Sequence, residues 1–242
     1  MKAKAAFLLS ALVPAGAALA QAQAPQPDHT FAFNAGAISD YRYRGISQSR
    51  LRPALQGGVD YTHASGLYLG AWASSIRWIK DGGGGADAEL DLYGGWRFPA
   101  GPLGLDLGVL TYNYPGHELA TSPNTQEGYV AASWGPATLK YSHAFSNLFG
   151  FANSKNSYYL DLSASFDLGR GWSLVPHVGH QKVKNNDPSS YTDYAVTLNK
   201  DFGKGLSASA AWVDTDSNGV YLSPGGKNLG RSGLVLGVKY AF

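Results

Sequence analysis

The segment Tyr158-Tyr-Leu-Asp-Leu-Ser-Ala-Ser-Phe-Asp-Leu168 alternates between apolar and mostly polar side chains. One face carries Tyr158, Leu160, Leu162, Ala164, Phe166 and Leu168, and the other carries Tyr159, Asp161, Ser163, Ser165 and Asp167. A period of two is that of a β-strand. The run is about twice as long as a typical soluble strand and matches the roughly 9 to 11 residues that cross a membrane as a tilted strand. It therefore predicts a membrane-spanning β-strand.

Twelve runs of this kind follow one another along the chain. They cover residues 30–43, 53–63, 66–76, 88–98, 103–114, 125–134, 137–146, 157–168, 172–181, 191–202, 205–214 and 231–242. Short connections of tight-turn residues, such as Ala64-Ser65 and Gly135-Pro136, alternate with longer polar ones, at 44–52, 77–87, 115–124, 147–156, 182–190 and 215–230. Alternating short and long connections with an even strand number are typical of outer-membrane proteins, whose short turns are periplasmic. We expect an all-β fold, a transmembrane antiparallel up-and-down β-barrel of about 12 strands, because only a closed barrel satisfies every strand hydrogen bond in hydrocarbon.

Aromatic residues gather near the ends of these runs. Near the short turns stand Tyr61, Trp96, Phe98, Trp134, Phe166, Trp172 and Phe202, and near the long connections stand Tyr41, Tyr43, Trp78 and Tyr158. Such residues form belts at the two interfaces between lipid and water. The pattern favours a membrane barrel over a soluble sandwich.

The composition excludes several classes of protein. Charged residues make up 15% of the 242, glycine contributes 31, and cysteine is absent, so disulfide scaffolds, cysteine zinc sites and thiol catalysis are excluded. The net charge of +2 includes Lys2 and Lys4. Both belong to a segment that we expect to be removed, so nothing indicates a nucleic-acid partner.

The N-terminal segment is predicted to be a cleaved secretory signal at residues 1–20. Lys2 and Lys4 precede an apolar stretch, and Ala18-Leu19-Ala20 is a cleavage site with small residues. Residues 21–28 form a short leader rich in proline and glutamine, and residues 29–242 form the barrel. The expected location is the outer membrane of a Gram-negative bacterium.

The start of the first run carries a resemblance to a known family. Ser39-Asp-Tyr-Arg-Tyr-Arg-Gly-Ile-Ser-Gln-Ser49, then Pro53 to Gly58 and Gly66 to Ser74, resemble the start of the TorF family of porins. The likeness covers nearly the whole chain in layout, although Ser75 stands where we expect asparagine. It implies a Gram-negative outer-membrane β-barrel and offers no catalytic residue to carry over to this chain. The C-terminal Val238, Tyr240 and Phe242 look like the aromatic signal that the barrel-assembly machinery recognises.

Alternation also predicts which side chains face the lumen. Thirteen charged residues share the inner face, namely Asp40, Arg42, Asp60, Glu89, Asp91, Arg97, Asp106, Glu127, Lys140, Asp161, Asp167, Asp193 and Lys239. The aromatic residues Tyr68, Trp72, Tyr93, Tyr112 and Tyr159 join them. Acids outnumber bases, which predicts a pore that prefers cations. The alternative is a lumen plugged by salt bridges, since a barrel of twelve strands lies between filled and open sizes.

Three further motifs carry weaker hypotheses. Asp214 to Gly219 matches the first half of a calcium loop, but Gly225 occupies the twelfth position, so an external turn accounts for it better. His177 and His180 face opposite sides of a strand and cannot share a metal ion. His143 lies near Ser142 and Ser146 and raises the possibility of a lipid hydrolase, but the adjacent runs offer no evident acidic or amide partner.

The sequence therefore predicts a non-enzymatic porin for passive diffusion of small hydrophilic solutes or ions, without a cofactor. The alternatives are a plugged barrel with a structural or adhesive role through its loops, and an outer-membrane hydrolase. Expected partners are outer-membrane lipid, the assembly machinery through Phe242 and small solutes. No connection stands out as a large constriction loop, which leaves monomer and trimer both open.

Overall fold

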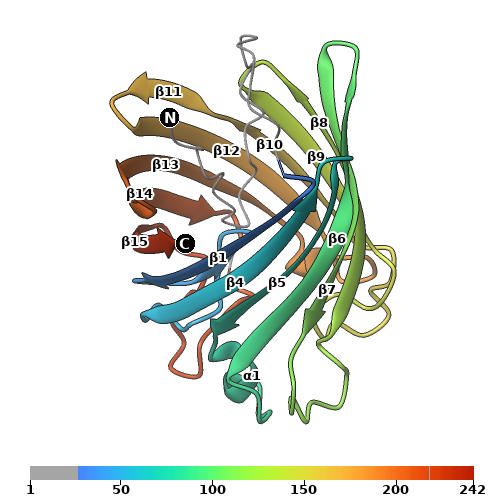
Figure 1. Ribbon diagram of the computed structural model, residues 1–242. Helices are drawn as coiled ribbons and strands as arrows, with labels where there is room; N and C mark the ends of the chain where they lie inside the picture. Colours follow the sequence, from blue (N-terminus) through green and yellow to red (C-terminus); the bar gives the residue numbers. More distant parts are fainter. Residues whose placement is uncertain (1–26, 218) are drawn as a thin grey trace.

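The computed structural model describes residues 27–217 and 219–242. The predicted signal at 1–20 and most of the leader at 21–28 lie outside these residues. The described chain forms one closed antiparallel barrel (Figure 1). Its strands are β1 (His29–Ile38), β4 (Ala54–His63), β5 (Leu67–Ser75), β6 (Ala88–Ala100), β7 (Leu103–Asn113), β8 (Thr125–Trp134), β9 (Ala137–Ala144), β10 (Tyr158–Ala164), β11 (Phe166–Gly169), β12 (Trp172–Lys182), β13 (Tyr191–Gly203), β14 (Leu206–Thr215) and β15 (Gly233–Ala241).

Each strand pairs with its neighbours in sequence, and the first pairs with the last. Ala35 of β1 lies opposite Tyr240 of β15, which closes the sheet. β10 and β11 are one strand interrupted at Ser165, and both pair with β12. Counting them as one gives twelve strands across the described chain, so the predicted fold class and strand number are confirmed.

The short turns lie at one end of the barrel and the long connections lie at the other. We call the end with the short turns the inner end and the end with the long connections the outer end, whereas inward and outward refer to the lumen and lipid faces of the strands. The outer end also carries α1 (Trp78–Asp81), the 3-10 turn η1 (Asp187–Ser189) and a small hairpin of β2 (Arg42–Tyr43) and β3 (Ile46–Ser47). In Figure 1, β4 to β7 run down to α1 and its neighbouring loops. None of the described helices is long and apolar enough to cross a membrane.

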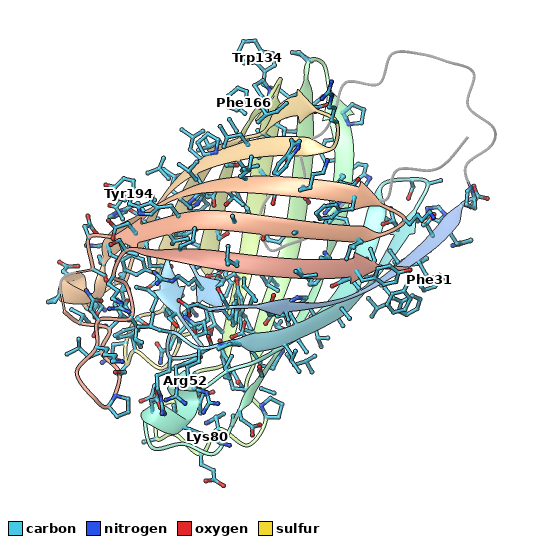
Figure 2. All side chains as sticks on the ribbon, turned by 90° about the vertical axis from the view of Figure 1, so that its left-hand side faces the viewer. Phe31, Arg52, Lys80, Trp134, Phe166 and Tyr194 are labelled. Carbon is cyan, nitrogen blue, oxygen red and sulfur yellow. The ribbon has the colours of Figure 1, made fainter. Side chains whose placement is uncertain are left out.

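The outer surface is apolar along the strands. Leu69, Val109, Leu162 and Leu236 are each about half exposed there, and Figure 2 shows Phe31, Trp134, Phe166 and Tyr194 pointing away from the ribbon. The inward positions are mostly polar, small or aromatic, with a few aliphatic residues such as Leu110 and Val235. Burying these apolar rows needs an apolar surrounding outside the barrel rather than a core inside it.

The first strand is shorter than the sequence predicts. β1 ends at Ile38 instead of continuing to residue 43, and the chain then turns into the barrel. Tyr41, predicted as part of an aromatic belt, is only 3% exposed, and Gly45 and Ile46 are buried. The run of alternating residues continues past Ile38, so the pattern of two does not reveal that the backbone leaves the sheet. The prediction that 44–52 is an external connection is wrong for the hairpin itself.

Two turn glycines test the packing of the inner end. Gly66 and Gly101 both have positive φ, but a Cβ at Gly66 would lie 2.0 Å from the carbonyl oxygen of Arg97, and one at Gly101 would meet nothing within 4 Å. Gly66→Ala should therefore cost about 1–3 kcal/mol beyond the backbone strain that Gly101→Ala shares with it. Urea unfolding of the refolded variants, followed by tryptophan fluorescence, measures the difference. Equal midpoints would contradict this register between β5 and β6.

Candidate functional site: the lumen and its internal hairpin

The hairpin inside the barrel is organised around one buried carboxylate. Asp40 accepts hydrogen bonds from Arg42 Nε at 2.7 Å and from the Ser47 hydroxyl at 2.5 Å. The Ser49 hydroxyl donates to the Arg52 carbonyl at 2.6 Å, lies 3.3 Å from the same Asp40 oxygen, and accepts the backbone N–H of Tyr41. Because both arms of the hairpin bond to Asp40, the segment from Asp40 to Ser49 is a folded unit in its own right.

The tip of the hairpin crosses the lumen to the opposite wall. The Arg44 guanidinium donates two hydrogen bonds to Glu127 of β8, at 3.0 and 2.7 Å, and one to Gln181 of β12 at 2.6 Å. Its carbon lies 4.2 Å from the centre of the Tyr159 ring and 4.8 Å from that of Tyr43. The two charged side chains are 6% and 2% exposed. Arg44 thus fills the centre of the barrel and binds its far side.

Two tyrosines of the hairpin contact the wall formed by β6 and β7. Tyr41 donates to Glu89 at 2.7 Å, and Tyr114 donates to the other oxygen of that carboxylate at 3.0 Å. Burial, followed by the nearby negative charges, raises the pKa of Tyr41 well above its usual value, which keeps its hydroxyl a donor. The hydroxyl of Tyr43 bonds to that of Tyr112. On this side the hairpin is therefore held by a hydrogen bond to the Glu89 carboxylate and by a hydrogen bond with the Tyr112 hydroxyl.

The remaining side of the hairpin packs against the ends of β13, β14 and the last long connection. Ser47 N–H donates to the carbonyl of Leu229, and Arg42 donates to that of Arg231 at 2.6 Å. Gly45 allows this approach, because a Cβ there would lie 2.8 Å from the Asp193 Cβ and 2.4 Å from a Thr215 methyl. The hairpin therefore lies within the outer half of the lumen and contacts the walls around it. The sequence alone did not make it stand out as a constricting connection.

A network of four polar side chains lies beside Arg44. Tyr159 donates to Asp193 at 2.8 Å, and His177 lies 2.9 Å from Asp161 and 3.5 Å from Asp193. The hydroxyl of Tyr159 and the His177 ring are 3.2 Å apart. Three strands, β10, β12 and β13, supply these groups because their inward positions stand at matching register.

The inner half of the lumen holds a second network. Tyr68 bonds to Tyr129 and donates to Asp106, which also pairs with Arg97 at 3.0 Å. Lys140 lies 3.9 Å from the centre of the Tyr129 ring. Separately, Tyr93 donates to Asp60 at 2.5 Å. Arg97 and Asp106 are partly exposed, unlike the pairs near the hairpin, so this half is the wetter one.

The predicted lumen residues other than Asp167 lie inside the barrel. Asp40 and Arg42 form part of the hairpin, Glu89, Tyr112, Glu127, Tyr159 and Asp193 lie beside it, and the remaining inward positions carry Asp60, Tyr68, Trp72, Asp91, Tyr93, Arg97, Asp106, Lys140, Asp161 and Lys239. Asp40 and Arg42 reach the lumen from the hairpin rather than from a strand. Asp167 is exposed at the inner turn, where it accepts the N–H of Gly169. Whether these groups line a working pore stays a prediction.

The sequence reasoning missed Arg44, the residue with the most contacts across the lumen. Gln181, Tyr129 and Tyr43 were missed as its partners or as members of the two networks. Gly45 and the pair of arginines flanking Tyr43 are the only local signal, and they indicate a turn without indicating its direction. Asp91 and Asp161 each have one buried carboxylate oxygen that accepts no hydrogen bond from the described residues.

Large and small side chains occupy opposite sides of the lumen. Trp72, Tyr93, Tyr112, Tyr129 and Tyr159 project from β5 to β10, whereas Ser209, Ala211, Gly237, Gly36 and Gly58 project from β14, β15, β1 and β4.

The structure also shows the surroundings of the residues in the three weaker motifs. In the segment that matches half of a calcium loop, Asn218 lies outside the described residues, while Asp214 and Asp216 accept the backbone N–H groups of Thr215 and Thr192. His180 faces outward, away from His177, as predicted. His143 has a partner after all, since it lies 3.3 Å from Asn156, but Ser142 points to the opposite face of β9.

The C-terminal residues lie on the apolar outer surface. Val238, Tyr240 and Phe242 are each about half exposed or more, and the Phe242 ring stacks on Phe33 of β1 at 5.9 Å. Backbone hydrogen bonds between Phe33 and Phe242 extend the closing ladder to the last residue. Recognition by an assembly machinery stays a prediction.

Comparison with known proteins places the chain in a family. Residues 21–242 match the family described as "Bacterial protein of unknown function (Gcw_chp)", and the chain belongs to it. No curated protein matches the sequence.

Among solved structures the fold is similar to that of two porins. The KdgM porin has a TM-score of 0.58 at 10% identity over 87% of this chain and 99% of that one. The NanC porin has a TM-score of 0.55 at 12% identity over 88% and 99%. At such identities the likeness establishes the fold, a twelve-stranded barrel. The name TorF is not returned by these comparisons.

The role of Asp40 in folding the hairpin can be tested by proteolysis. Asp40→Asn removes the charge that faces buried Arg42, which should free the hairpin because a buried ion loses its partner. Trypsin should then cut after Arg42 and Arg44 in the folded barrel, whereas these two bonds should stay uncut in the wild type. Mass spectrometry of the fragments identifies the cuts. Asp167→Asn, at an exposed turn, is the matched control, and protection of Asp40→Asn equal to this control would contradict the assignment.

Proposed function

We propose that the protein is an outer-membrane porin that allows passive diffusion of small hydrophilic solutes or ions. The observation that carries this proposal is the combination of a closed barrel with an apolar outer surface and a lumen of charged, hydrogen-bonded side chains. A surface of this kind is stable in hydrocarbon, and a polar lumen is stable only in water or when its groups pair with one another.

The fold likeness to the KdgM and NanC porins supports this class of function. One structure of the KdgM porin is described as a complex with disordered oligogalacturonate. We do not extend that ligand to this chain. Oligogalacturonate is a polyanion, and the lumen here contains Asp60, Asp91, Asp106 and Asp161, which would repel it.

Cations are the better match to this lumen. The acids that face the lumen, Asp40, Asp60, Glu89, Asp91, Asp106, Glu127, Asp161 and Asp193, outnumber the bases Arg42, Arg44, Arg97, Lys140 and Lys239. The excess of acids is smaller than the sequence alone predicts, because Arg44 joins the lumen and Asp167 leaves it. It still favours potassium over chloride.

A second candidate function follows from the hairpin. A barrel closed by its own chain at the outer end fits a structural or adhesive protein that acts through its external loops. We prefer the porin because the inner half of the lumen carries charged groups, among them the partly exposed pair Arg97 and Asp106, that such a role does not need. We further propose export through the signal at 1–20 and assembly through Phe242.

Single-channel recording in a planar bilayer tests the proposal. Refolded protein should give discrete steps, and a potassium chloride gradient should give a reversal potential on the cation side. Material that is folded by its heat-dependent gel shift yet gives no steps at any voltage would contradict the porin and favour the second candidate.

The acidic lumen makes a separate prediction about selectivity. Asp91→Asn with Asp106→Asn should reduce the ratio of potassium to chloride permeability by roughly twofold or more, because two of the inward carboxylates lose their charge. Asp201→Asn, at an exposed inner turn, is the control and should leave the ratio unchanged. An unaltered reversal potential in the double variant would show that ions do not pass these carboxylates.

A further inference from the structure

The position of the hairpin raises the question of how ions could pass through the lumen. The lumen of a porin must conduct, yet the segment from Asp40 to Ser49 fills its outer half with side chains that are almost fully buried. Ions can pass only if this unit moves or if a path remains beside it. The contacts between the hairpin and the wall favour movement of the hairpin over a path beside it.

We propose that the hairpin is a gate and that Arg44 is the residue that fastens it, so that the lumen conducts only when Arg44 leaves Glu127. This inference rests on the proposed porin function and names the side chain that controls it. The hairpin moves as a unit, because Asp40 binds both of its arms independently of the wall.

Arg44 is suited to this role by its position and its chemistry. It is the one residue in the described hairpin whose side chain reaches β8, β10 and β12 together. A guanidinium with two hydrogen bonds to one carboxylate is among the strongest side-chain contacts in proteins. If Arg44 departs, Glu127 is left with the Tyr112 hydroxyl at 3.3 Å, so the closed position is favoured strongly.

The backbone at the tip stores strain that opposes the same contact. Arg44 has φ of 47° and Gly45 has φ of 80°, and the left-handed region is unfavourable for arginine. Strain of this kind persists where surrounding contacts impose it, and it is released when they break. The closed hairpin therefore combines a strong ionic contact with a backbone that favours release, which is the property expected of a two-state element.

The walls that face Arg44 carry further charged groups. Asp193 and Asp161 with His177 lie on β13, β10 and β12, Lys140 lies on β9, and Asp91 lies on β6. These acids are alternative partners for a guanidinium that has left Glu127, and they lie along the lumen rather than across it. An open hairpin thus has acidic groups to receive Arg44 without leaving the barrel.

Single-channel recording of variants tests the gate. Arg44→Gln and Glu127→Gln should each raise the open probability about tenfold or more, since each removes charged hydrogen bonds. The exchange Arg44→Glu with Glu127→Arg should return it toward the wild-type value. Arg52→Gln is the control, because Arg52 is exposed on the same loop. Unchanged open probability in both single variants would overturn the role of Arg44.

A cross-link tests whether the hairpin must move. The natural chain has no cysteine, and a Cβ at Gly45 would lie 2.8 Å from the Asp193 Cβ, about 1 Å less than in a disulfide. Thr215→Ser is included in every variant of this test, because it removes the methyl that would lie 2.4 Å from a Cβ at position 45. In this background, Gly45→Cys with Asp193→Cys, oxidised by copper phenanthroline, should lose its conductance and regain it in dithiothreitol. The conductance of each variant with a single cysteine should be the same with and without either reagent.

The outcomes separate this inference from the function on which it rests. Oxidised, cross-linked protein that conducts as well as the reduced form would show a fixed constriction with a path beside it, and would overturn the gate while leaving the porin intact. Silence from the wild type and from Arg44→Gln, both demonstrably folded, would overturn the gate and the porin together.

Discussion

Every other feature of this molecule depends on the pairing of the first strand with the last. β1 and β15 exchange backbone hydrogen bonds from Ile38 and Gly237 to Asn34 and Ala241, and Phe33 and Phe242 continue the ladder. Without that pairing two strands would expose unpaired N–H and C=O groups, which is costly in hydrocarbon. With it, the sheet has no edge, and the only remaining choice for each side chain is outward or inward.

Closure of the barrel divides the strand side chains into two sets, one that faces the surroundings of the barrel and one that faces the lumen. The outward rows are apolar, and the inward rows form two polar networks, one around Arg44 and one around Asp106. The two networks differ in hydration because the chain itself fills the outer half. A hairpin that carries its own carboxylate, Asp40, can occupy that space without losing its hydrogen bonds.

The alternation of apolar and polar side chains was enough to predict the strands, because in a closed barrel one face of each strand points outward and the other points into the lumen. It predicted β8 at its observed bounds and most others to within two residues. It failed after Ile38, since Asp40 and Arg42 continue the alternation while their backbone leaves the sheet. Arg44 could not be predicted because its partners, Glu127 and Gln181, are 83 and 137 residues away, and nothing local encodes that meeting.

The central claim is that one face of each strand meets lipid and the other a lumen that water enters, and adjacent residues of β14 test it most directly. Ala210 stands in the outward row with Leu236, and Ala211 stands in the inward row. In a chain without natural cysteine, a charged thiosulfonate added to protein in lipid vesicles should label Ala211→Cys and spare Ala210→Cys. Equal labelling of the two, or labelling of Ala210→Cys alone, would contradict the account.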